Sequence, residues 1–261
     1  MTVMSAFDFV ADRFERYRRV PNHVPAAIRQ ALHVHGGIDA TARLLEVGCG
    51  TGRIGAQFAA ERDNYFGVDL SMAMLREFHR KTFARTPALI RADGGRLPFG
   101  DWVFDAVLMI HMTSVRNWRA LLAEAQRVLQ SGGVLAIGGT RGPPDGLDAI
   151  MQKRLDELTA EMGAAVQSPH RGAIGKWLRA ASSRHMEITP AHWTVDRVPR
   201  EFFLRKQSAA RFASLPADVR EAALPLLAEW TEHNIGPLDT PHSEVHYFHL
   251  ELYWFQGGPK E

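Results

Sequence analysis

A short apolar strand pattern that passes directly into alternating glycines constrains this chain more than any other feature. Leu44–Val47 has the pattern of a buried strand, and Gly48, Gly50 and Gly52 follow it at alternate positions. Glycine permits a positive φ and lets a ligand approach the bare backbone. A helical stretch begins directly afterwards, and the free N–H groups of a helix start suit an anionic group such as a carboxylate. The segment therefore predicts a ligand-binding loop at the carboxyl end of the first strand of an open α/β sheet.

Apolar runs and helical stretches alternate through the first half of the chain. Strands are predicted at Arg43–Val47, Tyr65–Val68, Ala88–Ile90, Phe104–Ile110 and Val134–Gly138. Helices are predicted at Ile54–Glu61, Met72–Phe83 and Trp118–Leu129. Alternation of this kind is typical of a mostly parallel sheet with helices on both faces, which is a Rossmann-like α/β fold.

The second half of the chain is less regular. Gly163–Arg184 is polar and weakly patterned, residues 191–205 indicate a possible strand, and Ala217–His233 indicates a helix that Pro225 interrupts. Val245–Gln256 is apolar on both faces, which is typical of a strand inside a sheet rather than at its edge. We expect a seven-stranded sheet in which this run is the one antiparallel strand, near one edge.

The predicted elements suggest a single domain with four parts. These are an N-terminal helical cap (1–37), a cofactor-binding core (38–140), a cap insertion (141–190) and a C-terminal part of the sheet (191–261). A chain of 261 residues is long enough for one substantial domain with an added cap, or for two small domains.

Composition and charge narrow the expected partners. The formal net charge is only +2, which gives no reason to expect a nucleic-acid or acidic-membrane partner. No window approaches the roughly 18 consecutive apolar residues of a membrane span, and the N-terminus lacks the apolar stretch of a signal peptide. Cys49 is the single cysteine, so an internal disulfide is impossible. We expect a cytoplasmic protein with a small-molecule substrate, and its oligomeric state is undetermined.

Two cofactors compete for the glycine loop. Gly50–Gly55 also matches the GxGxxG fingerprint of dinucleotide-binding proteins, and Asp69 after the second strand could bind ribose hydroxyls in either case. Glu46 lies two residues before the first glycine, an acidic position that the dinucleotide fingerprint does not require. Two further features, Asp93 after the third apolar run and the segment Leu97–Phe99, favour a cofactor other than a dinucleotide.

Residues 43–139 resemble the class I S-adenosylmethionine-dependent methyltransferases, and among them the small-molecule group called methyltransferase type 11. The motifs that carry the resemblance occur in order: the acidic glycine loop, Asp69–Ser71 with Met74–Leu75, Asp93 before Leu97–Phe99, Phe104–Asp105, and Arg127–Leu129 before Gly132–Gly133. The resemblance implies that the cofactor is S-adenosylmethionine.

The resemblance also implies a role for each matching residue. Gly48, Gly50 and Gly52 would lie against the methionine part of the cofactor, and Glu46 would support its amino group. Asp69 would accept hydrogen bonds from both ribose hydroxyls. Leu70 would pack on the adenine, Asp93 would bind the adenine amino group, and the backbone of Gly94 would approach the ring. The remaining expected cofactor contacts are Cys49, Met74, Ile110, Tyr17 and Arg18.

His111 is the candidate catalytic residue. The methyl group on a sulfonium is already activated, so such an enzyme needs mainly to align a nucleophile and exclude water. A neutral imidazole can take a hydroxyl proton near pH 7. The alternative, which the residue type alone favours, is a histidine that only lines the pocket and packs or hydrogen-bonds there. The segment Met109–Thr113 lacks the Asn/Asp-Pro-Pro-Tyr motif of amino-directed nucleic-acid and protein methyltransferases, which counts against those substrates.

The sequence leaves several functions open. We expect methyl transfer to an oxygen, nitrogen or carbon of a small molecule, and a quinone-type C-methyltransferase is one alternative. A nicotinamide-dependent oxidoreductase and a non-catalytic S-adenosylmethionine-binding protein are the others. No metal site is expected at His242, His246 and His249, because His246 and His249 should point to opposite faces of a strand.

Overall fold

The computed structural model of the chain describes residues 20–82, 87–112, 117–164, 171–207, 212 and 214–256. Its internal contacts divide the chain into two compact units. Unit 1 comprises the described residues of Met1–Thr140, Pro169–Ala191 and Phe248–Glu261. Unit 2 comprises those of Arg141–Ser168 and His192–Tyr247. The stretch expected as a cap insertion, 141–190, therefore contributes to both units.

A seven-stranded sheet forms the framework of the described chain, with strand order β3-β2-β1-β4-β5-β7-β6. The strands are β1 Arg43–Val47, β2 Asn64–Asp69, β3 Ala88–Arg91, β4 Phe104–Ile110, β5 Leu129–Arg141, β6 Arg184–Arg197 and β7 His242–Trp254. β1 pairs in parallel with β2 and β4, β2 pairs in parallel with β3, and β4 with β5. The carboxyl ends of β1, β2 and β4 therefore meet at one edge of the sheet, where the glycine loop lies.

β7 is the antiparallel strand and lies inside the sheet. The N–H of Gly132 donates to the carbonyl of Phe255, whereas Gly138, further along β5, faces the carbonyl of His249. Residue numbers that rise along β5 therefore fall along β7. On the other side, the N–H of Ser183 donates to the carbonyl of Trp254 just before β6 begins. The prediction of one interior antiparallel strand is confirmed.

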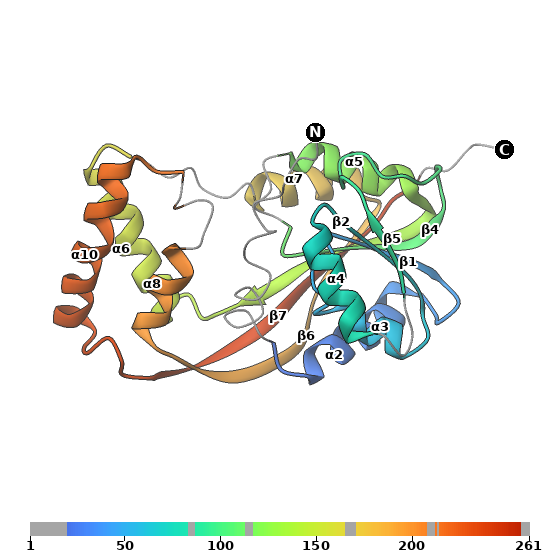
Figure 1. Cartoon of the computed structure of the whole chain (residues 1–261). Coiled ribbons are helices and arrows are strands. Elements are labelled where there is room, and N and C mark those ends of the chain that lie inside the picture. The colour runs from blue at the N-terminus through green and yellow to red at the C-terminus, as the bar shows by residue number, and fades with distance from the viewer. Residues whose placement is uncertain are drawn as a thin grey trace. The chain divides into compact units, whose positions relative to one another are not determined.

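Helices cover both faces of the sheet in unit 1 (Figure 1). One face carries α2 His23–Gly36, α3 Gly55–Ala60 and α4 Met72–Lys81, and the other carries α5 Trp118–Val128 and α7 Arg171–Ala181. On the first face, Gly36 of α2 approaches Val134 of β5, and Tyr65 of β2 contacts Phe78 of α4. On the second, Ile174 of α7 belongs to a core cluster with the strands. The predicted Rossmann-like architecture is confirmed.

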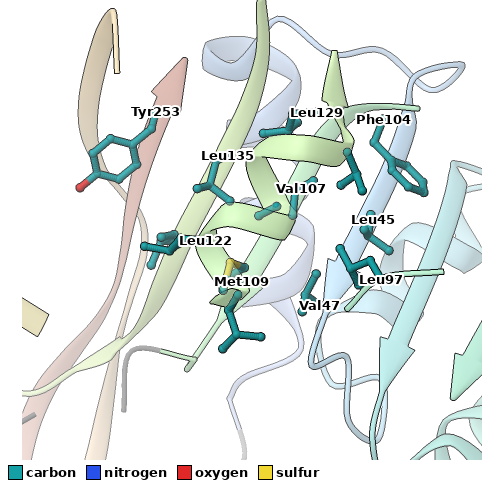
Figure 2. Close-up of a cluster of buried hydrophobic side chains, with 14 of the residues drawn as sticks. Leu45, Val47, Leu97, Phe104, Val107, Met109, Leu122, Leu129, Leu135 and Tyr253 are labelled. Carbon is teal, nitrogen blue, oxygen red and sulfur yellow. The ribbon is translucent and has the colours of Figure 1, made fainter. Parts of the chain in front are cut away.

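The main described core of unit 1 lies between the central strands and α5. The strand register aligns Leu45 of β1 with Val107 of β4 and Val107 with Leu135 of β5, and Figure 2 shows these side chains in one apolar layer. From α5 the buried side chains are Trp118, Leu121, Leu122, Ala125 and Val128. Their spacing of three and four residues places them on one helix face. This packing fixes the strands whose ends carry the residues expected to bind the cofactor.

Unit 2 has a helical core of its own. Its described helices are α6 Leu147–Glu161, α8 Pro199–Gln207 and α10 Ala217–Asn234. Met151 and Leu155 of α6 pack in one cluster with Ala223 and Leu227 of α10. The helix α10 runs through Pro225 rather than ending there, with buried contacts on both sides of the proline. The predicted interruption of this helix is therefore wrong.

Other elements also differ from the sequence-based expectation. β5 begins at Leu129 rather than Val134. The strand expected at 191–205 is instead β6, which ends at Arg197, followed by α8 from Pro199. A proline at the first helical position is pre-organised for the helix and explains the switch. Gly163–Arg184, for which no element was expected, contains α7. Within the described ranges no helix combines the length and apolar character required to cross a membrane.

Candidate cofactor site

The glycine loop is held against the neighbouring strand by backbone hydrogen bonds. The carbonyl of Val68 at the end of β2 accepts from the N–H of Gly48 at 2.8 Å and from that of Cys49 at 3.0 Å. The three alternating glycines all have a positive φ: 73° at Gly48, 54° at Gly50 and 76° at Gly52. Other L-residues adopt this region at a cost of roughly 1–2 kcal/mol, so the backbone path itself favours glycine at each position.

The three glycines face different surroundings. A Cβ on Gly48 would lie 2.5 Å from the sulfur of Met112, and one on Gly52 would lie 2.2 Å from Cδ2 of Phe78. A Cβ on Gly50 would meet no atom within 4 Å. Packing against the fully buried ring of Phe78 therefore requires Gly52, whereas the flexible side chain of Met112 could shift at Gly48, where the positive φ is what favours glycine. Among the three, only Gly50 presents bare backbone to open space, where a ligand can approach.

Asp69 at the end of β2 is fixed by the loop that it faces. The N–H of Gly50 donates to Oδ2 of Asp69 at 2.9 Å, and the N–H of Ser71 donates to Oδ1 at 2.8 Å. Ser71 is also the N-cap of α4, where its hydroxyl accepts from the N–H of Met74 at 3.3 Å. The two backbone donors therefore orient the carboxylate of Asp69. This geometry suits a group that accepts hydrogen bonds from a diol.

Glu46 is a buried acid, only 3% exposed, on the central strand β1. The hydroxyl of Tyr65 donates to its Oε2 at 2.6 Å. In the strand register Glu46 lies opposite Gly67, which has no side chain, and a Cβ at Gly67 would approach the Tyr65 hydroxyl to 3.2 Å. The ring of Tyr65 lies between Phe58 and Phe78, with centroids 6.0 Å away on each side.

Burial dominates the electrostatics of Glu46. Removal from water raises the pKa of its carboxyl to about 7, while the hydrogen bond from Tyr65 and the charge of Arg53 act in the opposite direction. The nearby charge of Asp69 adds to the rise in this pKa. Glu46 can therefore gain or lose its proton near neutral pH, and a cation placed beside it would favour the charged form.

Three of the expected cofactor contacts differ strongly in their exposure. Leu70 is 43% exposed at the sheet edge, and its carbonyl accepts from Nε of Arg91 at 3.1 Å. Met74 and Cys49 are buried in the protein, at 3% and 5% exposed. Burial raises the pKa of the Cys49 thiol well above its ordinary value, so this thiol is protonated at neutral pH. Leu70 is thus placed to meet a ligand, whereas the side chains of Met74 and Cys49 support the loop from inside.

Asp93 and Gly94 follow β3 at the same edge of the sheet. Oδ1 of the exposed Asp93 accepts from the N–H of Gly95 at 2.8 Å and so closes a tight turn. A Cβ on Gly94 would lie 2.6 Å from Leu121 and 2.7 Å from Val47. The glycine is therefore required by the close packing of this turn on the core.

His111 stands at the carboxyl end of β4, directly after the buried Ile110. Its φ is +59°, an uncommon conformation for a residue other than glycine. The N–H of His111 donates to the carbonyl of Gly138 at 2.8 Å, and its ring contacts Phe248 edge-to-face with centroids 6.3 Å apart. Gly139 leaves room for the ring, since a Cβ there would lie 2.9 Å from Nδ1. Backbone strain of this kind is concentrated at functional sites.

The structure thus brings the ends of β1, β2, β3 and β4 together with most of the expected residues. Tyr17 and Arg18 lie outside the described residues. Sequence reasoning missed the supporting contacts of four residues: Tyr65 donates to Glu46, Ser71 donates to Asp69, and Met112 and Phe78 pack against Gly48 and Gly52. Ser71 had a detectable signal, because a serine directly before a helical pattern is a common N-cap.

The arrangement fits S-adenosylmethionine. Gly50 leaves an open cradle, Asp69 offers an oriented diol acceptor, and Leu70 is an exposed apolar surface beside them. A family model described as a methyltransferase domain matches residues 45–137. A demethylmenaquinone methyltransferase of Mycobacterium tuberculosis is 30% identical over 205 residues, covering 74% of this chain and 84% of that protein. The chain belongs to the class I S-adenosylmethionine-dependent methyltransferases.

Another relative of this methyltransferase matches over a shorter stretch. A demethylmenaquinone methyltransferase of Tropheryma whipplei is 31% identical over 137 residues, and the match spans 52% of this chain but only 57% of that protein. The cofactor of the class is S-adenosylmethionine, so the dinucleotide reading of Gly50–Gly55 is set aside.

Solved structures share the fold. The YcgJ protein of Bacillus subtilis superposes with a TM-score of 0.58 at 16% identity, covering 89% of this methyltransferase and 99% of that chain. A phosphoethanolamine N-methyltransferase of Haemonchus contortus, in complex with phosphomonomethylethanolamine and S-adenosylhomocysteine, superposes with a TM-score of 0.54 at 16% identity. That match covers 96% of this methyltransferase and 58% of the other chain.

Proposed function

We propose that this chain transfers a methyl group from S-adenosylmethionine to a small-molecule acceptor. The observation that carries the proposal is the contact between Gly50 and Asp69. Among the three loop glycines, only Gly50 has open space where a Cβ would lie, so a ligand can approach its backbone. The N–H of Gly50 also donates to the carboxylate of Asp69 and orients it. A bare backbone and an oriented acceptor for hydroxyls therefore face the same edge of the sheet.

Each residue of the site has a distinct task in this proposal. The methionine part would lie on Gly50, with its ammonium group balanced by the charge of Glu46. The ribose hydroxyls would donate to Asp69, and the adenine would lie between Leu70 and the turn at Asp93. The bound cofactor supplies a methyl group that its sulfonium has already activated. The protein has to position the acceptor and exclude water.

His111 would orient the acceptor or remove its proton. It is half-buried at the end of β4, and its strained backbone aims the residue away from the regular course of the strand. A neutral imidazole can accept a proton from a hydroxyl as the nucleophile forms its bond to the methyl carbon. A pocket-lining role without proton transfer is the alternative, and the two differ in the turnover of a His111 variant.

The names of the relatives favour one acceptor class, a quinol ring methylated at carbon. In this reaction the ring carbon bonds to the methyl carbon, the carbon–sulfur bond breaks, and S-adenosylhomocysteine leaves. The ring carbon then loses its proton to a base, for which His111 is the candidate.

A two-arm assay tests both levels of the proposal. The purified chain is incubated with methyl-labelled S-adenosylmethionine and either a demethylated naphthoquinol or a mixed metabolite extract. We expect labelled product in both arms. Product in the extract alone would contradict the quinol acceptor but keep the methyltransferase. Tight binding of S-adenosylhomocysteine without product in either arm would instead indicate a non-catalytic binding protein.

A further inference from the structure

A cluster of imidazoles and carboxylates lies on β6 and β7 of unit 1, on strands that take no part in the glycine loop. His185 and Glu187 come from β6, and His249 and Glu251 come from β7. It differs from the histidine set His242, His246 and His249 considered from the sequence. In that set His246 pairs with Glu244 at 3.0 Å in unit 2.

Three of these side chains have the spacing of metal ligands. Nε2 of His185 lies 3.4 Å from Oε2 of Glu251 and 3.8 Å from Oε1 of Glu187. One ligand atom from each of the three residues lies within 4.8 Å of the other two. Around a tetrahedral zinc ion with bonds of about 2.1 Å, neighbouring ligand atoms lie about 3.4 Å apart. The side chain of Glu187 is 53% exposed and would have to turn towards the other two to bring all three into that range.

The imidazole of His185 is held rigidly with its metal-binding nitrogen turned inward. Its ring stacks on Tyr253 with centroids 4.5 Å apart and planes 22° apart. Nε2 is buried, and it has no hydrogen-bond partner among the residues that the structure describes. A buried polar atom in this state needs an explanation, and an ion bound between His185 and the two carboxylates would supply it.

Glu251 is held in place as a ligand by its neighbours. The Tyr253 hydroxyl donates a hydrogen bond to Oε2 of Glu251. Nε2 of His249 lies 3.3 Å from Oε1 of Glu251 and so orients the carboxylate from its other side. Partners that hold a ligating carboxylate in this way are a regular part of metal sites.

Among the lysines and arginines of the described chain, only Arg179 of α7 contacts one of these three side chains. Its Nη1 lies 3.6 Å from Oε2 of Glu251, and its side chain is 50% exposed. An arginine this exposed can turn towards water when a divalent ion takes its place. Two carboxylates and one neutral imidazole then balance the charge of the ion.

We propose that His185, Glu187 and Glu251 bind a divalent transition-metal ion of the zinc type, with water completing the coordination. An imidazole combined with carboxylates selects such ions over magnesium or calcium, which favour all-oxygen sites. The ion would join the edge strand β6 to β7. The site is independent of methyl transfer and takes no part in it.

Metal titration of the full-length chain, without an affinity tag and after treatment with a chelator, tests the proposal. ZnCl₂ is titrated by calorimetry, and Co²⁺ is titrated by absorption spectroscopy, which reports the coordination directly. We expect one equivalent to bind, with at least a tenfold loss of affinity in His185→Ala and in Glu187→Ala. His192→Ala removes an exposed histidine of the same strand and should bind like the wild type.

The variants His185→Ala and Glu187→Ala together test the proposal even if one of them fails to fold. Glu187 is 53% exposed, so Glu187→Ala leaves the fold intact even if His185→Ala unfolds, and circular dichroism checks both. Zinc should also raise the Tm of the wild type and not that of Glu187→Ala, because a ligand that binds only the folded state stabilises it. Absence of a bound equivalent, or equal affinity in Glu187→Ala and His192→Ala, would overturn the proposal.

Discussion

The Tyr65 hydroxyl donates a 2.6 Å hydrogen bond to Oε2 of Glu46, and both side chains are at least 96% buried between β1, β2 and the helices that cover them. This pair places a proton-binding group inside the protein at the base of the cofactor loop. The charge of Glu46 therefore depends on pH in a range where the protein is folded, and the charge in turn bears on both stability and cofactor binding.

Stability should depend on pH through Glu46. The folded pKa of Glu46 is about 7, above its ordinary value of 4.5, so between these values the folded state binds more protons than the unfolded state. The free energy of unfolding should then fall as pH rises through this window, by about 3 kcal/mol for a shift of this size. Chemical denaturation of wild type and Glu46→Gln at pH 5, 6 and 7.5 measures the difference. A wild-type slope no steeper than that of Glu46→Gln would contradict it.

Cofactor affinity should change in the opposite direction. A cationic amino group favours the ionised form of Glu46, so the apparent affinity follows the ionised fraction. For a pKa of about 7, that fraction rises roughly tenfold between pH 6 and pH 8. We expect the Kd of S-adenosylhomocysteine to fall about tenfold over this interval in the wild type. Calorimetry on Glu46→Gln should give a flat profile, and an equally steep profile in that variant would rule out Glu46 as the source.

Removal of the Tyr65 hydroxyl should act through Glu46. Tyr65→Phe keeps the ring between Phe58 and Phe78 but leaves a buried carboxyl oxygen without its donor, which costs about 1–3 kcal/mol of stability. Tyr247→Phe in unit 2 is the matched control. Thermal unfolding should show a clear loss for Tyr65→Phe only, and the pH at which cofactor affinity changes should move upward. Equal stability of Tyr65→Phe and Tyr247→Phe would show that the hydrogen bond from Tyr65 to Glu46 does not stabilise the protein.

The loop glycines should separate into two kinds. Gly52→Ala forces a Cβ into Phe78 at a positive φ, so we expect a loss of about 2–5 kcal/mol. Gly50→Ala has open space and should lose only about 1–2 kcal/mol from its backbone conformation, while its Kd for S-adenosylhomocysteine rises at least tenfold. Denaturant titration and calorimetry on both variants give these two quantities. A Gly50→Ala protein with wild-type affinity would show that the ligand does not approach there.

Replacement of Asp69 should weaken the cofactor without unfolding the protein. An asparagine at this position carries no charge, but its side-chain oxygen can still accept from the N–H of Ser71 or Gly50, so Asp69→Asn keeps the loop while removing acceptor capacity for the ribose. We expect the Kd of S-adenosylhomocysteine, measured by calorimetry, to rise tenfold or more. Asp145→Asn, at an exposed position in unit 2, should leave it unchanged. Equal affinities of the two variants would remove Asp69 from the cofactor site.

Turnover separates the two roles of His111. If the imidazole takes a proton from the acceptor, His111→Ala should slow methyl transfer at least tenfold with little change in cofactor affinity. If the ring only lines the pocket, turnover should stay close to that of the wild type, and this result would exclude the base. Single-turnover kinetics with saturating cofactor measure the step directly.

The framework of the site follows from local sequence rules. The alternating glycines after Leu44–Val47 and the acid Asp69 after the next strand predict where the cofactor lies, because parallel strands carry their carboxyl ends to one edge. The same rules could not assign the tasks of the individual glycines. Gly52 is required by Phe78 and Gly48 lies against Met112, and both of these side chains are far away in sequence and reach the loop only through the packing of the fold.

The polar support of the site depends on strand register, which periodicity does not fix. Tyr65 reaches Glu46 because Gly67 lies opposite Glu46 and leaves space for the hydroxyl. A shift of one residue would point Tyr65 to the other face of the sheet. Strand register also explains how the proposed metal ligands come together. His185 and Glu251 are 66 positions apart and meet only where β6 runs antiparallel to β7.

The most direct measurement is the mass of the product formed from trideuteromethyl-labelled S-adenosylmethionine. The purified chain is incubated with this cofactor and a small-molecule extract, in parallel with Asp69→Asn. A small molecule that gains the trideuteromethyl group with the wild type, and gains it at least tenfold more slowly with Asp69→Asn at low cofactor concentration, is the predicted result. No labelled small molecule with a wild-type protein that binds S-adenosylhomocysteine would contradict the assignment as a methyltransferase acting on small molecules.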